Sequence, residues 1–134
     1  MSRSRLAGLR LLVVEDEALV AMLIEDTLLA LGCAVVGPAG NVAQALELVE
    51  HEPIDLALLD VNLGGGERSY AVAEALAVRE IPFLFVTGYG DKGVDRRYRR
   101  APVLQKPFDP DQLERVVAAT IGRPDRSGAG RRRR

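Results

Sequence analysis

The sequence predicts an α/β fold in which a five-stranded parallel sheet carries helices on both faces. Short, continuous apolar runs recur along the chain, as expected of strands that are buried on both faces. Between them lie longer segments whose apolar residues recur with helical spacing. Strands that alternate with helices form parallel sheets, because right-handed crossovers place the helices against the faces of the sheet.

The predicted elements follow one another in a regular order. Strands are expected at residues 9–14, 34–37, 54–60, 82–86 and 102–105. Helices are expected at residues 18–31, 42–50, 67–79 and 110–121. Asn41 and Asp109 stand where they can cap the second and the last of these helices. Residues 88–100 offer few apolar anchors, so the fourth helix of the series is expected to be short or mobile. This order fits the flavodoxin-like (βα)5 doubly wound arrangement, with strand order 2-1-3-4-5.

The length and composition indicate one domain. The chain has 134 residues, of which 48% are hydrophobic and 4% aromatic. We expect residues 1–8 to form an N-terminal extension, residues 9–122 the domain and residues 123–134 a disordered Arg-rich tail. The tail could contact nucleic acid or acidic lipid, or it could be a solvated end. Neither a membrane span nor a signal peptide is visible, so a cytoplasmic location is expected.

Polar side chains stand where several of the predicted strands end. Glu15 and Asp16 follow the first strand, Asp60 ends the third, Thr87 follows the fourth and Lys106 follows the fifth. The carboxyl ends of the strands of a doubly wound sheet line one crevice, so we expect these side chains to meet there. Three close carboxylates repel one another unless a cation neutralises them, and a set of oxygen ligands suits Mg²⁺.

The same residue types fit phosphoryl transfer to an aspartate. Asp60, at the end of a central strand, is the expected nucleophile. A bound Mg²⁺ would shield the negative charge of the incoming group, while Lys106 and Thr87 could contact its oxygens. A cis bond between Lys106 and Pro107, which X-Pro sequences permit, would direct the lysine into the crevice. Each residue alone has an ordinary explanation, but the five together favour this function.

At these positions the sequence resembles the receiver domain of bacterial two-component response regulators. The resemblance covers residues 9–121 and is carried by the segments LLVVEDE (11–17), LLDVNL (58–63), VTG (86–88) and QKPF (105–108). It implies that Asp60 accepts a phosphoryl group from a histidine kinase or a histidine phosphotransfer protein. It also implies that Asp16, Asp60 and the backbone carbonyl of Asn62 bind Mg²⁺, with Glu15 acting directly or through water. Such a protein is a phosphoacceptor and not an enzyme.

The segment FLFVTGYG (83–90) is similar to the Phe-Ala-Thr-Gly-Tyr motif of a receiver subfamily. Members of that subfamily are often single domains served by kinases of the HWE or HisKA2 type. The usual receiver has a switch aromatic three residues before the lysine, where this sequence has Val103. We expect Thr87, Gly88, Tyr89 and Val103 to form the switch, with Tyr89 taking part of the aromatic's role and residues 88–100 reordering on phosphorylation.

Three other functions fit the sequence less well. An aspartate-nucleophile phosphohydrolase would need a second acid two residues after the nucleophile, where Asn62 stands. A nucleotide- or flavin-binding module would need a glycine-rich first turn, but residues 15–17 are acidic. A protein-binding module of this fold that is not phosphorylated is disfavoured by the intact set of site residues. No DNA-binding segment follows residue 121, so the protein is expected to signal by protein contact or to act as a phosphate sink. A monomer or weak dimer is expected.

Overall fold

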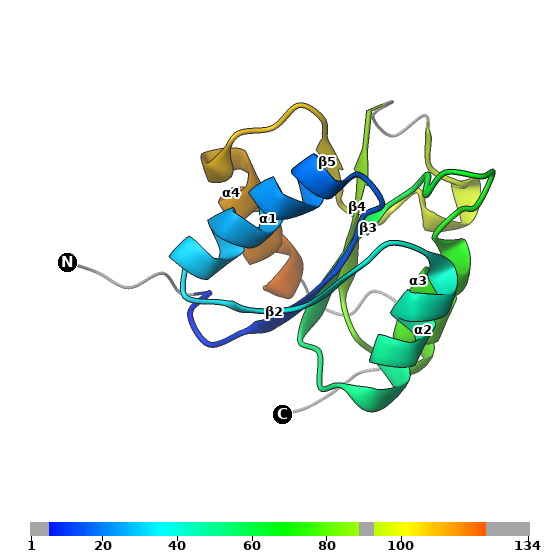
Figure 1. Cartoon of the computed structure of the whole chain (residues 1–134), viewed down its shortest axis with the longest axis horizontal. Coiled ribbons are helices and arrows are strands. Elements are labelled where there is room, and N and C mark those ends of the chain that lie inside the picture. The colour runs from blue at the N-terminus through cyan, green and yellow to red at the C-terminus, as the bar shows by residue number, and fades with distance from the viewer. Residues whose placement is uncertain (1–5, 89–92, 123–134) are drawn as a thin grey trace.

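A five-stranded parallel sheet lies at the centre of the structure, with helices on both of its faces (Figure 1). The computed structural model of the chain describes residues 6–88 and 93–122. The strands are β1 (Arg10–Val14), β2 (Ala34–Ala39), β3 (Leu56–Asp60), β4 (Phe83–Thr87) and β5 (Val103–Gln105). The helices are α1 (Ala18–Ala30), α2 (Val42–His51), α3 (Tyr70–Val78) and α4 (Pro110–Ile121). The strand order is β2-β1-β3-β4-β5, which confirms the predicted flavodoxin-like arrangement.

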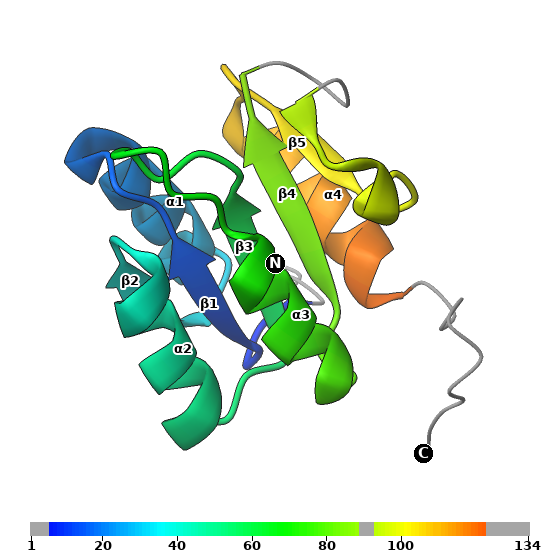
Figure 2. The ribbon, with the colours of Figure 1, turned by 90° about the vertical axis from the view of Figure 1, so that its right-hand side faces the viewer.

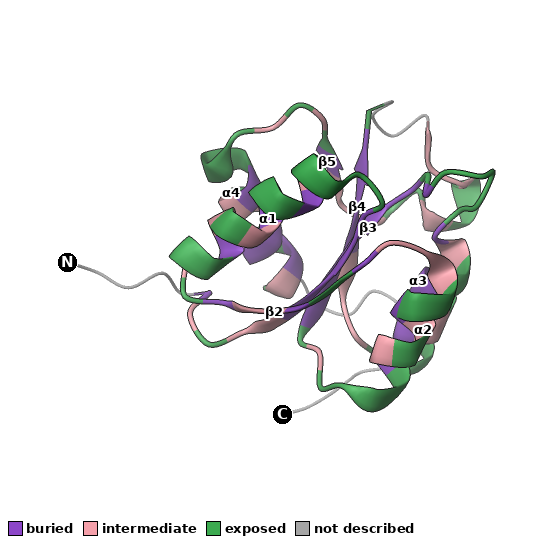
Figure 3. Cartoon of the chain, viewed as in Figure 1, coloured by how far each residue is buried: buried purple, intermediate pink, exposed green. Residues whose placement is uncertain are grey.

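Two apolar layers hold the helices against the sheet. Alternate residues of a strand point to opposite faces, so Leu58 packs into the layer under α1 and α4, whereas Leu59 packs into the layer under α2 and α3. Figure 2 shows α2 and α3 in front of the sheet. Every residue of β3 is buried, and the burial of the central strands is visible in Figure 3. Burial on both faces explains why the strands are continuous apolar runs.

The segment before α3 is a narrow turn and not the start of the helix. The sequence predicted a helix from residue 67, whereas α3 begins at Tyr70. Asn62 and Arg68 face each other in an antiparallel bridge, which takes the chain out of helical geometry. Residues 64–66 are glycines with φ of 79°, 58° and 79°, a region of backbone conformation that other residues rarely adopt. The turn therefore folds back beside the end of β3.

In its described part, the segment between β4 and β5 forms the 3₁₀ helix η2 (Arg96–Tyr98) and no α-helix, so the fourth helix of the series is short, as predicted. Tyr98 stacks on Tyr70, with ring centroids 5.6 Å apart and planes at 14°. The Tyr70 hydroxyl accepts a hydrogen bond from the Asp95 backbone N–H at 2.7 Å. Tyr70, which sequence analysis did not single out, thus attaches this segment to the start of α3.

The described chain begins inside the core. Leu6 is fully buried, and its carbonyl accepts a hydrogen bond from the thiol of Cys33 at 3.3 Å. Burial raises the pKa of that thiol, which keeps it protonated and suits a packing role. No helix within residues 6–88 and 93–122 has the length and apolar character needed to cross a bilayer.

A capping box begins α4, and its loss gives a test of the fold. The Asp109 side chain accepts from the Gln112 backbone N–H, and the Gln112 side chain accepts from the Asp109 N–H, both at 2.8 Å. Asp109→Ala removes one acceptor and is expected to lower the free energy of unfolding by about 1 kcal/mol in urea denaturation. Asp26→Ala, on the exposed side of α1, is the control and is expected to change it by less than about 0.5 kcal/mol. Equal losses in the two variants would show that the cap contributes nothing specific.

Candidate functional site

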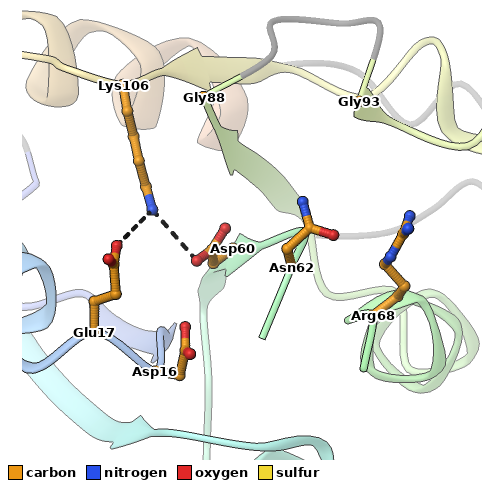
Figure 4. Close-up of a pocket in the computed structure, with 8 residues that line it drawn as sticks. All are labelled: Asp16, Glu17, Asp60, Asn62, Arg68, Gly88, Gly93 and Lys106. Carbon is orange, nitrogen blue, oxygen red and sulfur yellow. Dashed lines mark hydrogen bonds and ion pairs between the residues drawn. The ribbon is translucent and has the colours of Figure 1, made fainter. Parts of the chain in front are cut away.

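An open cleft lies at the carboxyl ends of the strands (Figure 4). It is lined by Asp16, Glu17, Asp60, Asn62, Arg68, Gly88, Gly93 and Lys106. The structure therefore brings together, from separate elements, acidic and lysine side chains that the sequence predicted to meet. Glu17 and Arg68 also line the cleft, although the sequence analysis gave them no role. The acidic run at residues 15–17 was a signal for Glu17, whereas Arg68 is visible only once the turn before α3 is known.

The sheet fixes the backbone positions of the site residues. Asp60 pairs with Val86 in the β3–β4 ladder, so Asp60 and Thr87 end neighbouring strands. The backbone N–H of Lys106 donates to the carbonyl of Thr87 at 2.9 Å, which holds the lysine beside the end of β4. Thr87 is buried at 1% exposure and Asp60 at 6%. The hydroxyl and the carboxylate are therefore carried on rigid, desolvated strand ends, as a site of defined geometry requires.

Three carboxylates converge beside β3. Glu15, Asp16 and Asp60 each offer an oxygen within 4.8 Å of the other two. Glu15 is only 3% exposed, whereas Asp16 is exposed. Burial, together with the hydrogen bond to Asp60 and its negative charge, raises the pKa of Glu15 to about 7. Near neutral pH this carboxyl group is therefore balanced between its protonated and ionised forms.

Lys106 supplies positive charge to this cluster. Its Nζ lies 3.3 Å from Oδ2 of Asp60, 3.4 Å from Oε1 of Glu15 and 3.6 Å from Oε1 of Glu17 (Figure 4). Burial disfavours the ammonium charge, but the negative charges of Glu15 and Asp60 outweigh this effect and raise the pKa of Lys106. The lysine is thus charged at neutral pH. The peptide bond between Lys106 and Pro107 is cis, the geometry that would direct the lysine into the cleft.

The carboxylates fit a hard divalent cation. Oε1 of Glu15 is buried and makes no hydrogen bond, although the Lys106 ammonium lies 3.4 Å away. One ammonium cannot neutralise Glu15, Asp16 and Asp60 together, so the cluster has excess negative charge that a cation would offset. Its donors are all oxygens, and the cleft is open to water, which suits an ion that keeps part of its hydration shell.

The predicted switch residues occupy different environments. Gly88 is exposed and lines the cleft, while Val103 is partly buried and packs into the layer under α2 and α3. Val103 pairs with Phe85 of β4, whose ring contacts that of Tyr98 at a centroid distance of 5.6 Å. Aromatic packing therefore lies beside the position where a switch aromatic is missing. Tyr89 lies outside the described residues, so its expected role stays a prediction.

Comparison with known proteins gives a consistent assignment. The family profile described as "Response regulator receiver domain" matches residues 11–118. The solution structure of SdrG from Sphingomonas melonis Fr1 is 51% identical, with a TM-score of 0.76, and the match covers 90% of this chain and 99% of that one. A BeF3-activated conformation of SdrG from Pseudomonas melonis Fr1 is 53% identical, with a TM-score of 0.74, over 86% of this chain and 98% of that one.

Longer regulators match over part of their length. The transcriptional regulatory protein PdtaR of Mycobacterium tuberculosis is 31% identical over 117 residues, which cover 85% of this chain and 57% of PdtaR. The phyllosphere-induced regulator PhyR of Methylorubrum extorquens is 31% identical over 114 residues, which cover 83% of this chain and 43% of PhyR. The chain spans about half the length of these two curated relatives.

The fold, the site and the comparisons together define a receiver-type signalling domain. The chain belongs to the response regulator receiver domain family, which confirms the resemblance seen in its sequence motifs. Members of this family take part in signalling with histidine kinases.

The raised pKa of Glu15 predicts that the cation-free protein loses stability as pH rises. The unfolded chain has the ordinary glutamate pKa of 4.5 and the folded protein a pKa of about 7, so folding favours the protonated carboxyl group. The stability from this protonation is complete below the unfolded pKa and is lost as pH rises through the folded pKa. In EDTA, the wild-type free energy of unfolding, taken relative to Glu15→Gln, is expected to fall between about pH 5 and about pH 8. A difference that stays constant across this range would contradict the proposed environment of Glu15.

Proposed function

We propose that this receiver accepts a phosphoryl group on Asp60, in a reaction that depends on bound Mg²⁺. The observation that carries the proposal is the position of the Asp60 carboxylate. It is buried at the end of a central strand, 3.3 Å from the Lys106 ammonium and within reach of an ion held with Glu15 and Asp16. The match to a relative whose structure was solved in a BeF3-activated conformation supports the same chemistry.

The residues of the chain divide the work of the transfer among them. Asp16, Asp60 and the backbone carbonyl of Asn62 would hold Mg²⁺, with Glu15 binding it directly or through water. When bound, the ion supplies positive charge that offsets the repulsion between the Asp60 carboxylate and an incoming phosphoryl group. Because metal ligands must be deprotonated, binding of Mg²⁺ would displace the proton that the Glu15 carboxyl group holds part of the time near neutral pH.

Transfer exchanges one bond to phosphorus for another. An Asp60 carboxylate oxygen attacks the phosphorus of a phosphohistidine in line with the histidine nitrogen. The new P–O bond forms as the P–N bond breaks, and the electron pair of the P–N bond stays on the departing imidazole nitrogen. The Lys106 ammonium, which pairs with Asp60 beforehand, can then pair with a phosphoryl oxygen, and the Thr87 hydroxyl can donate to another.

The proposed donor, in the cytoplasm, is a histidine kinase of the HWE or HisKA2 type or a histidine phosphotransfer protein. The segment FLFVTG (83–88), which forms β4 and the rim of the cleft, supports this choice of kinase. The product is a phosphorylated protein and not a released small molecule, so the chain acts as a phosphoacceptor with only its own autophosphorylation and autodephosphorylation chemistry. The signal would then pass by protein contact or end in a phosphate sink.

Phosphotransfer to Asp60 is testable with purified kinases of the host. Radiolabelled phosphate is expected to move from the cognate kinase to the wild-type protein in the presence of Mg²⁺ and not to Asp60→Asn. Asp55→Asn, an exposed residue at the opposite end of β3, is the matched control and is expected to be labelled normally. Equal labelling of Asp60→Asn and wild type would remove Asp60 from the role proposed for it.

We further expect phosphorylation to reorder the segment at residues 88–100, with Thr87 and Gly88 at its start. Its described part is attached by Tyr70, whose hydroxyl accepts from Asp95 and donates to the carbonyl of Gly93 at 3.2 Å. Movement of Thr87 toward a phosphoryl group would shift the adjoining backbone and these contacts. Amide exchange at residues 93–98, measured with Mg²⁺ and with or without beryllofluoride, is expected to change at least severalfold. Identical exchange in the two states would contradict this switch.

A further inference from the structure

The cleft contains a second basic side chain that the proposed transfer does not use. Arg68 lines it together with Asp60, Asn62 and Lys106. Figure 4 shows Arg68 and Lys106 on opposite sides of Asp60. Lys106 is already paired with carboxylates, whereas the Arg68 guanidinium makes no ion pair or hydrogen bond with any residue in the described ranges 6–88 and 93–122. The cleft therefore holds a cation whose hydrogen-bond donors are available to a bound anion.

The backbone that carries Arg68 is fixed by hydrogen bonds. Arg68 pairs with Asn62 in the antiparallel bridge, and Asn62 is only two residues beyond Asp60. Within the same turn, the N–H of Leu63 donates to the carbonyl of Glu67 at 2.9 Å. The N–H of Ser69 donates to the carbonyl of Val61 at 3.1 Å, and both of these residues are buried. Arg68 is thus held in register with the strand that ends at Asp60.

The side chain of Glu67, which precedes Arg68, points toward α2. The Glu67 carboxylate accepts a hydrogen bond from the backbone N–H of Val42 at 3.1 Å, at the start of α2. Successive residues of an extended segment point to opposite sides. Glu67 therefore attaches the turn to α2, while Arg68 is directed to the cleft.

Phosphorylation of Asp60 would give the Arg68 guanidinium an anionic partner in the cleft. Before transfer, the carboxylates would hold the proposed Mg²⁺, and a nearby guanidinium would oppose the binding of that cation. A phosphoryl group adds negative charge and several strong acceptor oxygens beside Asp60. Thr87 ends β4 and Lys106 follows β5, so Arg68 would be the charged donor on the side of the group that faces Asn62. The planar fork of arginine matches phosphoryl oxygens.

We propose that Arg68 is a phosphoryl-binding residue, whose guanidinium pairs with an oxygen of the phosphoryl group on Asp60 on the side opposite Lys106. This inference rests on the proposed phosphorylation of Asp60. It gives the site two cationic side chains with different tasks. Lys106 pairs with carboxylates before transfer and can pair with a phosphoryl oxygen after it, while Arg68 gains a partner only after transfer and so favours the phosphorylated state.

The test compares two probes, Mg²⁺ alone and beryllofluoride with saturating Mg²⁺, on the whole protein. Arg68→Gln is expected to weaken beryllofluoride binding about tenfold, because one charge-assisted hydrogen bond is lost. The same variant is expected to bind Mg²⁺ as tightly as wild type or slightly more tightly, because a nearby positive charge is removed. Arg68→Lys, which keeps the charge without the fork, is expected to lose less. Arg79→Gln, at the far end of α3, is the matched control and is expected to leave both affinities unchanged.

The outcomes separate this role from the proposed function. Beryllofluoride binding by wild type that is lost in Asp60→Asn supports the proposed function whatever Arg68 does. In that case, unchanged beryllofluoride affinity in Arg68→Gln overturns the role of Arg68 alone. Equal weakening of Mg²⁺ and beryllofluoride binding also overturns it, since a merely structural residue would affect both probes. A selective loss of beryllofluoride binding, with Mg²⁺ affinity kept, is the result that the proposal requires.

Discussion

The burial of two neighbouring carboxylates, Glu15 and Asp60, is the constraint on which the site depends. A desolvated carboxylate is costly unless it is paired, protonated or bound to a cation. The Lys106 ammonium lies within 3.4 Å of both residues but carries only one positive charge. Burial, followed by the hydrogen bond to Asp60 and its negative charge, raises the pKa of Glu15 to about 7. The acidic cluster of Glu15, Asp16 and Asp60 thus carries the charge that the proposed Mg²⁺ would offset.

The fold produces this arrangement because it buries strand ends that are polar. β3 is buried along its whole length, and its last residue, Asp60, shares that burial. Glu15 directly follows β1, and its backbone N–H donates to the carbonyl of Ala39 at 2.9 Å, so it too is held at the carboxyl ends of the strands. Apolar packing of the strands thus provides the energy that keeps the carboxylates together. The charge of the cluster is then available for binding.

Sequence reasoning found most of the fold and of the site because both depend on local patterns. Apolar runs identified β1, β3 and β4, and the polar residues at their ends identified the cleft, since parallel strands share one carboxyl edge. The cap at Asp109 was likewise a local signal and is present. Strand order followed from general rules of connection and not from any single residue.

Residues whose positions depend on irregular backbone were missed. Arg68 was assigned to a helix, because the apolar spacing of α3 does not show where the glycine turn ends. Tyr70 reads as an ordinary helical residue, yet its hydroxyl contacts Asp95, 25 residues away in the sequence. Such contacts depend on three-dimensional packing that periodicity does not encode. The positions of the three carboxylates and of Lys106 could be predicted from the strand order alone. The position of Arg68 could not, because it depends on the turn before α3.

The most direct test of the central claim is chemical mapping of the phosphorylated residue. The protein is incubated with acetyl phosphate and Mg²⁺, reduced with borohydride, which converts an aspartyl phosphate to homoserine, and digested for mass spectrometry. The account predicts homoserine at position 60, with the signal lost when EDTA replaces Mg²⁺. Homoserine at another aspartate, or a signal that does not depend on Mg²⁺, would contradict it.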